Sequence, residues 1–232
     1  MGLRILAILL LALASPGVAM ANDAGLEYFS PASWRPMKEH PTIALSAERI
    51  SIHLDRDAAR VVVQATYLNR GAACAVAMGF PEREDQGPEA GVFARTFSTW
   101  VEGTRAKVDA TPWADSDRGR IRYWVKTVRF GAGQARRVRI AYRFPYAVRG
   151  SPPVAAFEYI LSTGSSWHGA IGRLDVEVGS SRYRIDRLVE HNSALARFER
   201  RGNRLSWHAK DLEPGPADDI WIDLPEPAKA SD

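Results

Sequence analysis

Residues 50–68 read ISIHLDRDAARVVVQATYL, and the pattern of this stretch decides the fold class. From Ile50 to Asp55 apolar and polar residues alternate, which is the period of a strand with one buried face. Arg56-Asp57 then predicts a tight turn, and the β-branched run from Arg60 to Leu68 predicts a returning strand. The stretch therefore predicts two antiparallel strands of a β-sheet.

Outside this pair the two-residue period recurs along most of the chain, whereas helical periodicity is not sustained over several turns. Before Gly150-Ser151-Pro152-Pro153 it predicts about seven strands in roughly a hundred residues, which is typical of an immunoglobulin-like sandwich. One of the extended segments is expected from Val92 to Glu102. Beyond that segment it predicts further strands. We therefore expect an all-β protein built of one or two antiparallel β-sandwiches.

The expected organisation has five parts. These are a signal peptide (1–21), an irregular N-terminal segment (22–42), a β-sandwich (43–149), a second β unit (150–225) and a disordered tail (226–232). The pattern leaves open whether the second unit is a separate sandwich or supplies strands that complete the first.

The N-terminus has the parts of a secretory signal peptide. Arg4 supplies a positive charge, Ile5 to Ala14 form an unbroken apolar run, and Ala19-Met20-Ala21 has small residues where a signal peptidase reads. Pro16-Gly17 interrupts the apolar segment too early for a transmembrane helix, and no cysteine follows it as in a lipoprotein. We therefore expect cleavage after Ala21 and a periplasmic or secreted protein with no membrane span.

The composition indicates a globular protein with a substantial core. Hydrophobic residues make up 46% of the 232 residues, and the single cysteine cannot form an intramolecular disulfide. That residue, Cys74, shares a strand face with Val76 and Met78, which predicts an inert core thiol. The formal net charge of +4 is too small to indicate nucleic-acid binding.

No pattern predicts a catalytic centre, a cofactor or a metal site. The histidines are not within metal-ligand spacing of one another, and His53 and His208 are expected to be ordinary exposed side chains. The segment from Gly164 to His168 resembles a serine-hydrolase elbow centred on Ser166. However, His168 stands where that motif needs glycine, and strands are predicted on both sides. A structural turn is the favoured interpretation.

In this turn three residues are expected to serve the fold. Gly164 and Gly169 supply backbone freedom, and Trp167 fills a pocket in the core. Replacement of Trp167 is therefore expected to be costly, and Ser166→Ala nearly silent.

The stretch Tyr159–Gly172, YILSTGSSWHGAIG, also carries a family resemblance. It resembles exported bacterial proteins grouped as domain-of-unknown-function family 4424, which share a Y-x-L-x-T-G-x-x-W-x-G-x-I-G segment. Shorter matches lie at residues 78–81, 97–103, 124–130 and 210–214, so the likeness extends from about Ile43 to Leu224. The resemblance implies export and a β-rich fold with no assigned activity, and it provides no catalytic residue to carry over.

One candidate binding surface comes from a predicted hairpin between Ile121 and Phe144, turning at Gly131-Ala132-Gly133-Gln134. One face of this hairpin would be apolar. The other would gather Arg122, Trp124, Lys126, Arg137, Arg139 and Arg143. Like charges directly opposite one another destabilise an antiparallel pair. Either acidic side chains of a neighbouring strand or an anionic partner must therefore offset them.

Two classes of function remain open. The favoured one is a non-enzymatic binding or structural module of the cell envelope, whose partner is an anionic envelope polymer, a lipid headgroup or a protein. The other is a cofactor-free hydrolase that acts on envelope polysaccharide or peptide. The lack of a credible nucleophile favours the first class. A concave site that gathers ionisable side chains from separate strands would favour the second.

Overall fold

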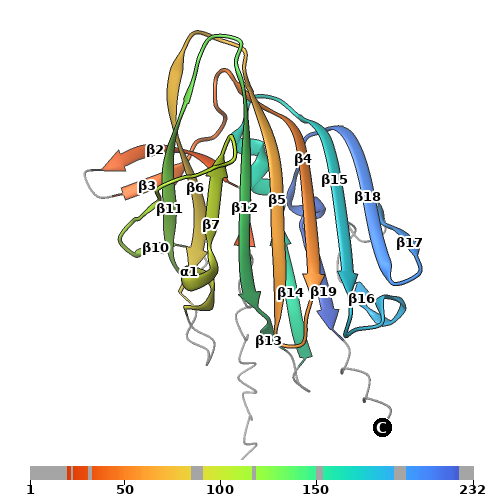
Figure 1. The fold of residues 1–232 in the computed structure, drawn as a ribbon. Coiled ribbons are helices and arrows are strands. Elements are labelled where there is room, and N and C mark those ends of the chain that lie inside the picture. Colours follow the sequence, from red (N-terminus) through yellow and green to blue (C-terminus); the bar gives the residue numbers. More distant parts are fainter. Residues whose placement is uncertain are drawn as a thin grey trace, which may run out of the picture.

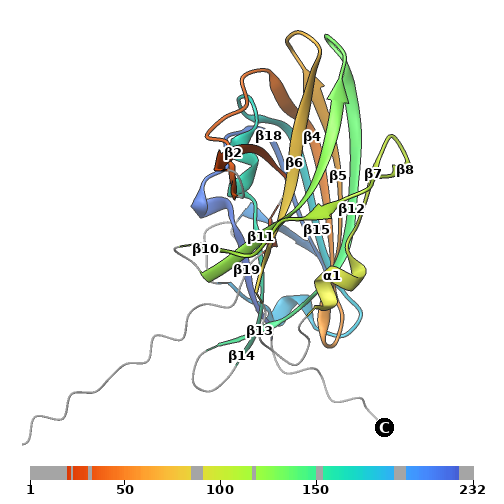
Figure 2. The same cartoon turned by 90° about the vertical axis from the view of Figure 1, so that its left-hand side faces the viewer.

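The computed structural model describes residues 20–21, 23–30, 33–84, 91–116, 119–149, 154–190 and 197–224. Strands dominate these residues and form one eight-stranded sheet, with two smaller sheets packed behind it (Figure 1, Figure 2). The predicted all-β, sandwich-like fold is confirmed. Within the described ranges, no helix has the length and apolar character needed to cross a membrane.

The eight-stranded sheet contains strands from both halves of the chain. In spatial order they are β17 (Glu199–Arg201), β18 (Arg204–Leu212), β15 (Ile171–Ser180), β4 (Ile43–Leu54), β5 (Ala58–Asn69), β12 (Ala135–Pro145), β7 (Ser98–Val101) and β8 (Thr104–Arg105). β4 and β5 are the pair predicted first, with Ile50 opposite Val63. β15 lies parallel to β4, so residues after 153 complete the sheet that residues 43–149 begin.

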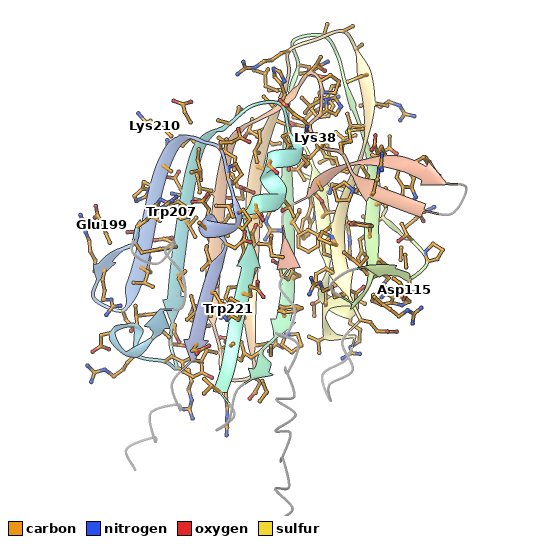
Figure 3. All side chains as sticks on the ribbon, turned by 180° about the vertical axis from the view of Figure 1, so that it is seen from behind. Lys38, Asp115, Glu199, Trp207, Lys210 and Trp221 are labelled. Atoms are coloured by element: carbon orange, nitrogen blue, oxygen red, sulfur yellow. The ribbon has the colours of Figure 1, made fainter. Side chains whose placement is uncertain are left out.

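Two smaller sheets cover the inner face of the large one and lie beside each other when seen from behind (Figure 3). One contains β1 (Met20–Ala21), β13 (Ala147–Arg149), β14 (Val154–Ile160), β16 (Val189–Glu190) and β19 (Ile220–Leu224). The other contains β2 (Ala24–Ser30), β3 (Ser33–Pro36), β6 (Cys74–Arg83), β9 (Asp109–Ala110), β10 (Ala114–Ser116) and β11 (Gly119–Phe130). Cleavage after Ala21 would remove β1.

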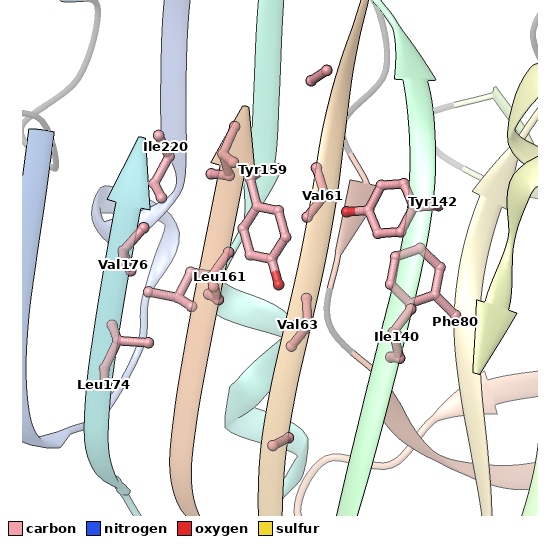
Figure 4. Close-up of a cluster of buried hydrophobic side chains, with 14 of the residues drawn as sticks. Val61, Val63, Phe80, Ile140, Tyr142, Tyr159, Leu161, Leu174, Val176 and Ile220 are labelled. Atoms are coloured by element: carbon pink, nitrogen blue, oxygen red, sulfur yellow. The ribbon is translucent and has the colours of Figure 1, made fainter. Parts of the chain in front are cut away.

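One hydrophobic core lies between the layers and joins all three sheets. Tyr159 of β14, Tyr142 of β12 and Phe80 of β6 meet Val61 and Val63 of β5 there (Figure 4). Apolar side chains are stabilised by their removal from water, and here both halves of the chain contribute to the same buried volume. The segments 43–149 and 150–225 therefore do not form two independent sandwiches.

Two expected segments differ in the structure. Residues 22–42 are not irregular throughout, because β2 pairs with the edge of β6 and then with β3. This pairing depends on backbone hydrogen bonds at a sheet edge, which leave only a weak side-chain pattern. Val92–Thr96, expected as an extended segment, forms a short helix, α1. Residues 1–19 of the predicted signal peptide and the predicted tail 226–232 lie outside the described residues.

The predicted hairpin between Ile121 and Phe144 is wrong. β11 pairs with β6, with Trp124 opposite Phe80, whereas β12 pairs with β5 and β7. The turn at 131–134 forms, but the two strands that it joins diverge into different layers. A two-residue period identifies a strand and its faces but does not identify its neighbour. On β11 the predicted basic face is the one that turns to the core.

The turn around Trp167 holds the N-terminal segment against the body. Trp167 is fully buried, and its Nε1 donates to the carbonyl oxygen of Asp23 at 2.9 Å. The Oγ of Ser166 accepts from the N–H of Gly25 at 3.2 Å, and Gly169 adopts a φ of +64°. A Cβ on Gly164 would lie 3.1 Å from the Cδ1 of Ile171. The motif is thus part of the core and of the attachment of β2.

The attachment should depend on pH because of His40. Its Nδ1 accepts from the N–H groups of Thr42 and Ile43, so the ring is neutral at that nitrogen. Two causes lower the pKa of His40 below its usual value: burial of the ring, which has the larger effect, and the nearby His168. As the pH falls below about 6.5, the unfolded chain takes up a proton before the folded protein does. The free energy of unfolding should therefore decrease.

The matched variant is His40→Asn, whose side-chain oxygen can accept the same N–H groups without titrating. Urea denaturation of both proteins between pH 7.5 and pH 5 checks the prediction. The wild-type protein should lose stability over this interval more steeply than the variant. Equal slopes would show that His40 is not the titrating group.

Candidate functional site

The structure does not bring the six residues of the predicted basic face together. Arg122, Trp124 and Lys126 lie on β11 in the six-stranded sheet, whereas the three arginines of β12 lie on the outer face of the eight-stranded sheet. The two groups therefore have to be considered separately.

The β11 group is neutralised within the protein. Glu82 Oε2 accepts from Arg122 Nε at 2.5 Å and from Trp124 Nε1 at 2.7 Å. The guanidinium of Arg122 also lies 4.5 Å from the ring centroid of Trp113. Lys126 is buried on the core side, where its Nζ lies 2.5 Å from Asp23 Oδ2. These residues form internal ion pairs and offer no free positive charge to a ligand.

The β12 group is exposed, as the alternation on that strand predicts. Arg137 Nη2 lies 3.4 Å from Glu102 Oε2, and the N–H of Arg137 also donates to this carboxylate, which lowers the pKa of Glu102. The guanidinium of Arg139 lies 4.4 Å from the ring centroid of Trp100. Among the described residues, no carboxylate lies within ion-pair distance of Arg139 or Arg143.

The register of six strands places five basic residues and one glycine in one line across the outer face, which we call the cationic row. From β17 to β12 its members are Arg201, Arg204, Gly179, His53, Arg60 and Arg143. Directly opposite residues have side chains on the same face of a sheet. With strands about 4.8 Å apart, the row extends over roughly 24 Å.

Several members of the cationic row have internal partners. Glu177 lies 3.2 Å from Arg204, and Asp55 lies 2.6 Å from Arg60. Arg143, at the β12 end, has no such carboxylate among the described residues. Positive charge is therefore uncompensated mainly at this end, where Arg139 is four residues away on the same strand face.

A second line, nearer the other end of the strands, contains His208, Asp175, Arg49, Gln64, Arg139 and Trp100. Asp175 accepts from His208 Nδ1 at 2.7 Å and pairs with Arg173 at 2.9 Å. Burial raises the pKa of Asp175, but these hydrogen bonds outweigh it and hold the pKa below its usual value. His208 is exposed, as predicted, but the sequence did not reveal its carboxylate partner.

Two hollows indent this face at the β15 and β18 side. The larger, of about 430 Å³, surrounds Gly179 between His53 and Arg204, with Glu177 and Arg201 at its wall. The smaller, of about 310 Å³, lies beside Arg173, Asp175, His208, Ala209 and Lys210. Both gather ionisable side chains from separate strands, which is the condition that favours an enzyme.

The geometry nevertheless does not form a hydrolytic triad. At His53, which lines the larger hollow, Ser181 Oγ and Asp55 Oδ1 both lie 3.4 Å from Nε2. A Ser-His-Asp triad needs the serine and the aspartate on opposite nitrogens of the ring. The smaller hollow has no hydroxyl side chain in its lining. Within the described ranges there is also no cluster of three metal-ligating side chains.

Solved structures with a similar fold include a Legionella pneumophila protein to which a nutrient-binding role is provisionally ascribed. It matches 89% of this chain over 70% of its own length, with a TM-score of 0.66 and 14% identity. An M1 zinc metallopeptidase of Deinococcus radiodurans (11% identity, TM-score 0.40) and leukotriene A4 hydrolase of Saccharomyces cerevisiae (8%, 0.46) match 79% of this chain. The chain spans only 42% and 29% of their respective lengths. At 14% identity, the Legionella protein shows similarity of fold alone.

No protein-family model and no curated protein matches the sequence. The resemblance to family 4424 therefore stays a prediction from the motifs around Trp167.

Proposed function

We propose that the protein is an exported, non-enzymatic binding module of the cell envelope that holds an acidic polysaccharide on the outer face of its eight-stranded sheet. The observation that carries the proposal is the uncompensated end of the cationic row at Arg143, together with Arg139. Export rests on the signal peptide predicted at residues 1–21. A binding role also agrees with the description of the Legionella protein of similar fold.

An extended polymer suits this surface better than a lipid headgroup does. The two uncompensated arginines, Arg139 and Arg143, are four residues apart on β12 and therefore roughly 13 Å from each other, which exceeds the size of one headgroup. Membrane association through a flat face is usually strengthened by apolar or aromatic side chains that enter the interface. Among the described residues, the exposed large hydrophobic side chains are Tyr28 and Val148, which lie on β2 and β13 and not on this sheet.

The double replacement Arg139→Ser with Arg143→Ser tests the proposal. Each exposed ionic contact contributes up to about 1 kcal/mol, so loss of two should weaken binding roughly ten-fold at low salt. Binding of both proteins should decrease as the salt concentration rises. Retention on immobilised polygalacturonate, with neutral dextran as the comparison resin, measures this. The fold should be unchanged, because neither guanidinium has a carboxylate partner to lose.

The matched control is Arg35→Ser with Arg120→Ser, which removes the same charge from the six-stranded sheet. An equal loss of retention in this control would mean that binding follows net charge alone, and the proposal would fail. Stronger capture by vesicles of anionic lipid than by polygalacturonate would replace the polymer by a membrane surface.

A hydrolase remains the second candidate because of one observation. Asp175 accepts a hydrogen bond from Nδ1 of His208. The opposite ring nitrogen, Nε2, is then left to act as a general base. Release of reducing ends from polygalacturonate by the wild-type protein but not by His208→Gln would replace binding by hydrolysis as the function.

A further inference from the structure

We propose that the hollow at Gly179 is a separate binding site for a small, hydroxyl-rich anion, that is, a sugar molecule that carries one carboxylate or phosphate. The proposal does not depend on the polymer surface at Arg139 and Arg143. The volume of the hollow, about 430 Å³, lies within the range of roughly 300–1,000 Å³ that is typical of small-molecule sites.

The floor of the hollow exists because residue 179 has no side chain. Gly179 lies directly between His53 of β4 and Arg204 of β18, so these two side chains stand roughly 10 Å apart across it. Its φ lies outside the left-handed region, and a Cβ would meet its nearest neighbours, Arg204 Cγ and Asn203 O, at 4.0 Å. Neither backbone strain nor close packing requires glycine here. The effect of the glycine is to leave space.

The walls of the hollow favour an anion with hydroxyl groups. Arg204 and Arg201 lie directly opposite each other on β18 and β17, and both line the hollow. Glu177 engages only the Nη1 of Arg204 at 3.2 Å, and Glu199 engages only the Nη2 of Arg201 at 3.1 Å. Further N–H groups of both guanidinium groups are therefore left for a carboxylate or phosphate. Ser51 and Ser181 add hydroxyl groups at the same rim, and these suit the hydroxyls of a sugar.

Hydrogen bonds within the protein hold the rim of the hollow in place, so the rim is ordered without a ligand. Ser180 Oγ donates to the carbonyl oxygen of Leu54 at 2.7 Å and accepts from the N–H groups of Arg182 and Tyr183. Asn203 Oδ1 accepts from the N–H of Ile185 at 2.9 Å. A rim fixed in advance does not have to be ordered on binding, which lowers the entropic cost of association.

Gly179→Leu is the decisive variant, because it fills the hollow at a position where a strand residue fits without a clash. Glucuronate and glucose 6-phosphate are the probes, glucose is the neutral comparison, and amide NMR of the labelled protein is the measurement. At least one of the two anions should give saturable shifts at Ser180 and Arg204, with an affinity at least ten-fold above that for glucose. Gly179→Leu should weaken this binding at least ten-fold without lowering the unfolding midpoint in urea.

Two further proteins separate this site from the polymer surface. Ala141→Leu, on the same face but outside the hollow, and the Arg139→Ser, Arg143→Ser protein should both bind the probe as the wild type does. Gly179→Leu should in turn keep its retention on polygalacturonate. Absence of saturable shifts with either anion, or wild-type affinity in Gly179→Leu, would overturn the proposal whatever the polymer result. Equal affinity for inorganic phosphate would overturn the part assigned to hydroxyl recognition.

Discussion

Replacement of Trp167 by alanine should lower the free energy of unfolding by about 3–5 kcal/mol, which is typical for the loss of a large aromatic side chain from a core. The indole is fully buried, and its ring centroid lies 4.7 Å from that of Tyr67. It also donates to the carbonyl oxygen of Asp23, so the variant loses both packing and one attachment of the N-terminal segment. Urea denaturation at pH 7.5 measures the difference.

Trp167→Phe and Ser166→Ala are the controls for this prediction. The phenylalanine variant keeps an aromatic ring in the pocket but loses the hydrogen bond, so its loss should be clearly smaller. The sequence predicts that Ser166→Ala is nearly silent, but its Oγ accepts from the buried N–H of Gly25. That variant should therefore lose about 1 kcal/mol. A stability of Trp167→Ala equal to that of the wild type would contradict the assignment of Trp167 to the core.

The second large effect is expected at the buried ion pair between Lys126 and Asp23. Lys126→Met should cost about 3–5 kcal/mol, because it leaves an ionised carboxylate inside the protein without its partner. Both side chains are almost fully excluded from solvent, and Asp23 Oδ1 has no hydrogen-bond partner among the described residues. Desolvation is therefore offset mainly by the single ammonium group.

The double variant Asp23→Leu with Lys126→Met tests whether the unpaired carboxylate causes this loss of stability. Replacement of both partners of a buried pair by apolar residues is often neutral or stabilising. The double variant should therefore recover most of the stability lost by Lys126→Met in the same urea experiment. If it is no more stable than the single variant, the loss comes from packing around Lys126 and not from an unpaired charge.

Local pattern predicted most of the strands, but it missed β2 and β3, and it failed where the fold depends on which strands are neighbours. Alternation identified β4 and β5 and the outward face of β12, because burial of one face imposes a two-residue period on the sequence. On β11 the alternation predicted a strand correctly, but it predicted the wrong face to be exposed to solvent. That strand is covered by the core near Lys126 and Val128 and by a second apolar cluster near Tyr123, so no single face is polar.

The candidate site could be predicted only in part for the same reason. The exposure of Arg139 and Arg143 follows from their own strand. The cationic row and the hollow at Gly179 depend on the register of strands that are far apart in the sequence, and no local signal specifies that register. Gly179 is an example. In the sequence it is one small residue in a strand, and only the neighbouring His53 and Arg204 show that it forms the floor of a hollow.

The parallel contact between β4 and β15 determines when the protein can finish folding. β4 is made early and its neighbour β5 follows directly, but its other neighbour, β15, is made only after β5 to β14 have been synthesised. Until then β4 has an open edge, with unpaired N–H and C=O groups that can attract other chains. Pairings between such distant segments also slow folding, since a long loop must close before they form. Completion of the large sheet therefore waits for the C-terminal third of the chain, and a nascent chain that stops before Ile171 retains an unprotected edge.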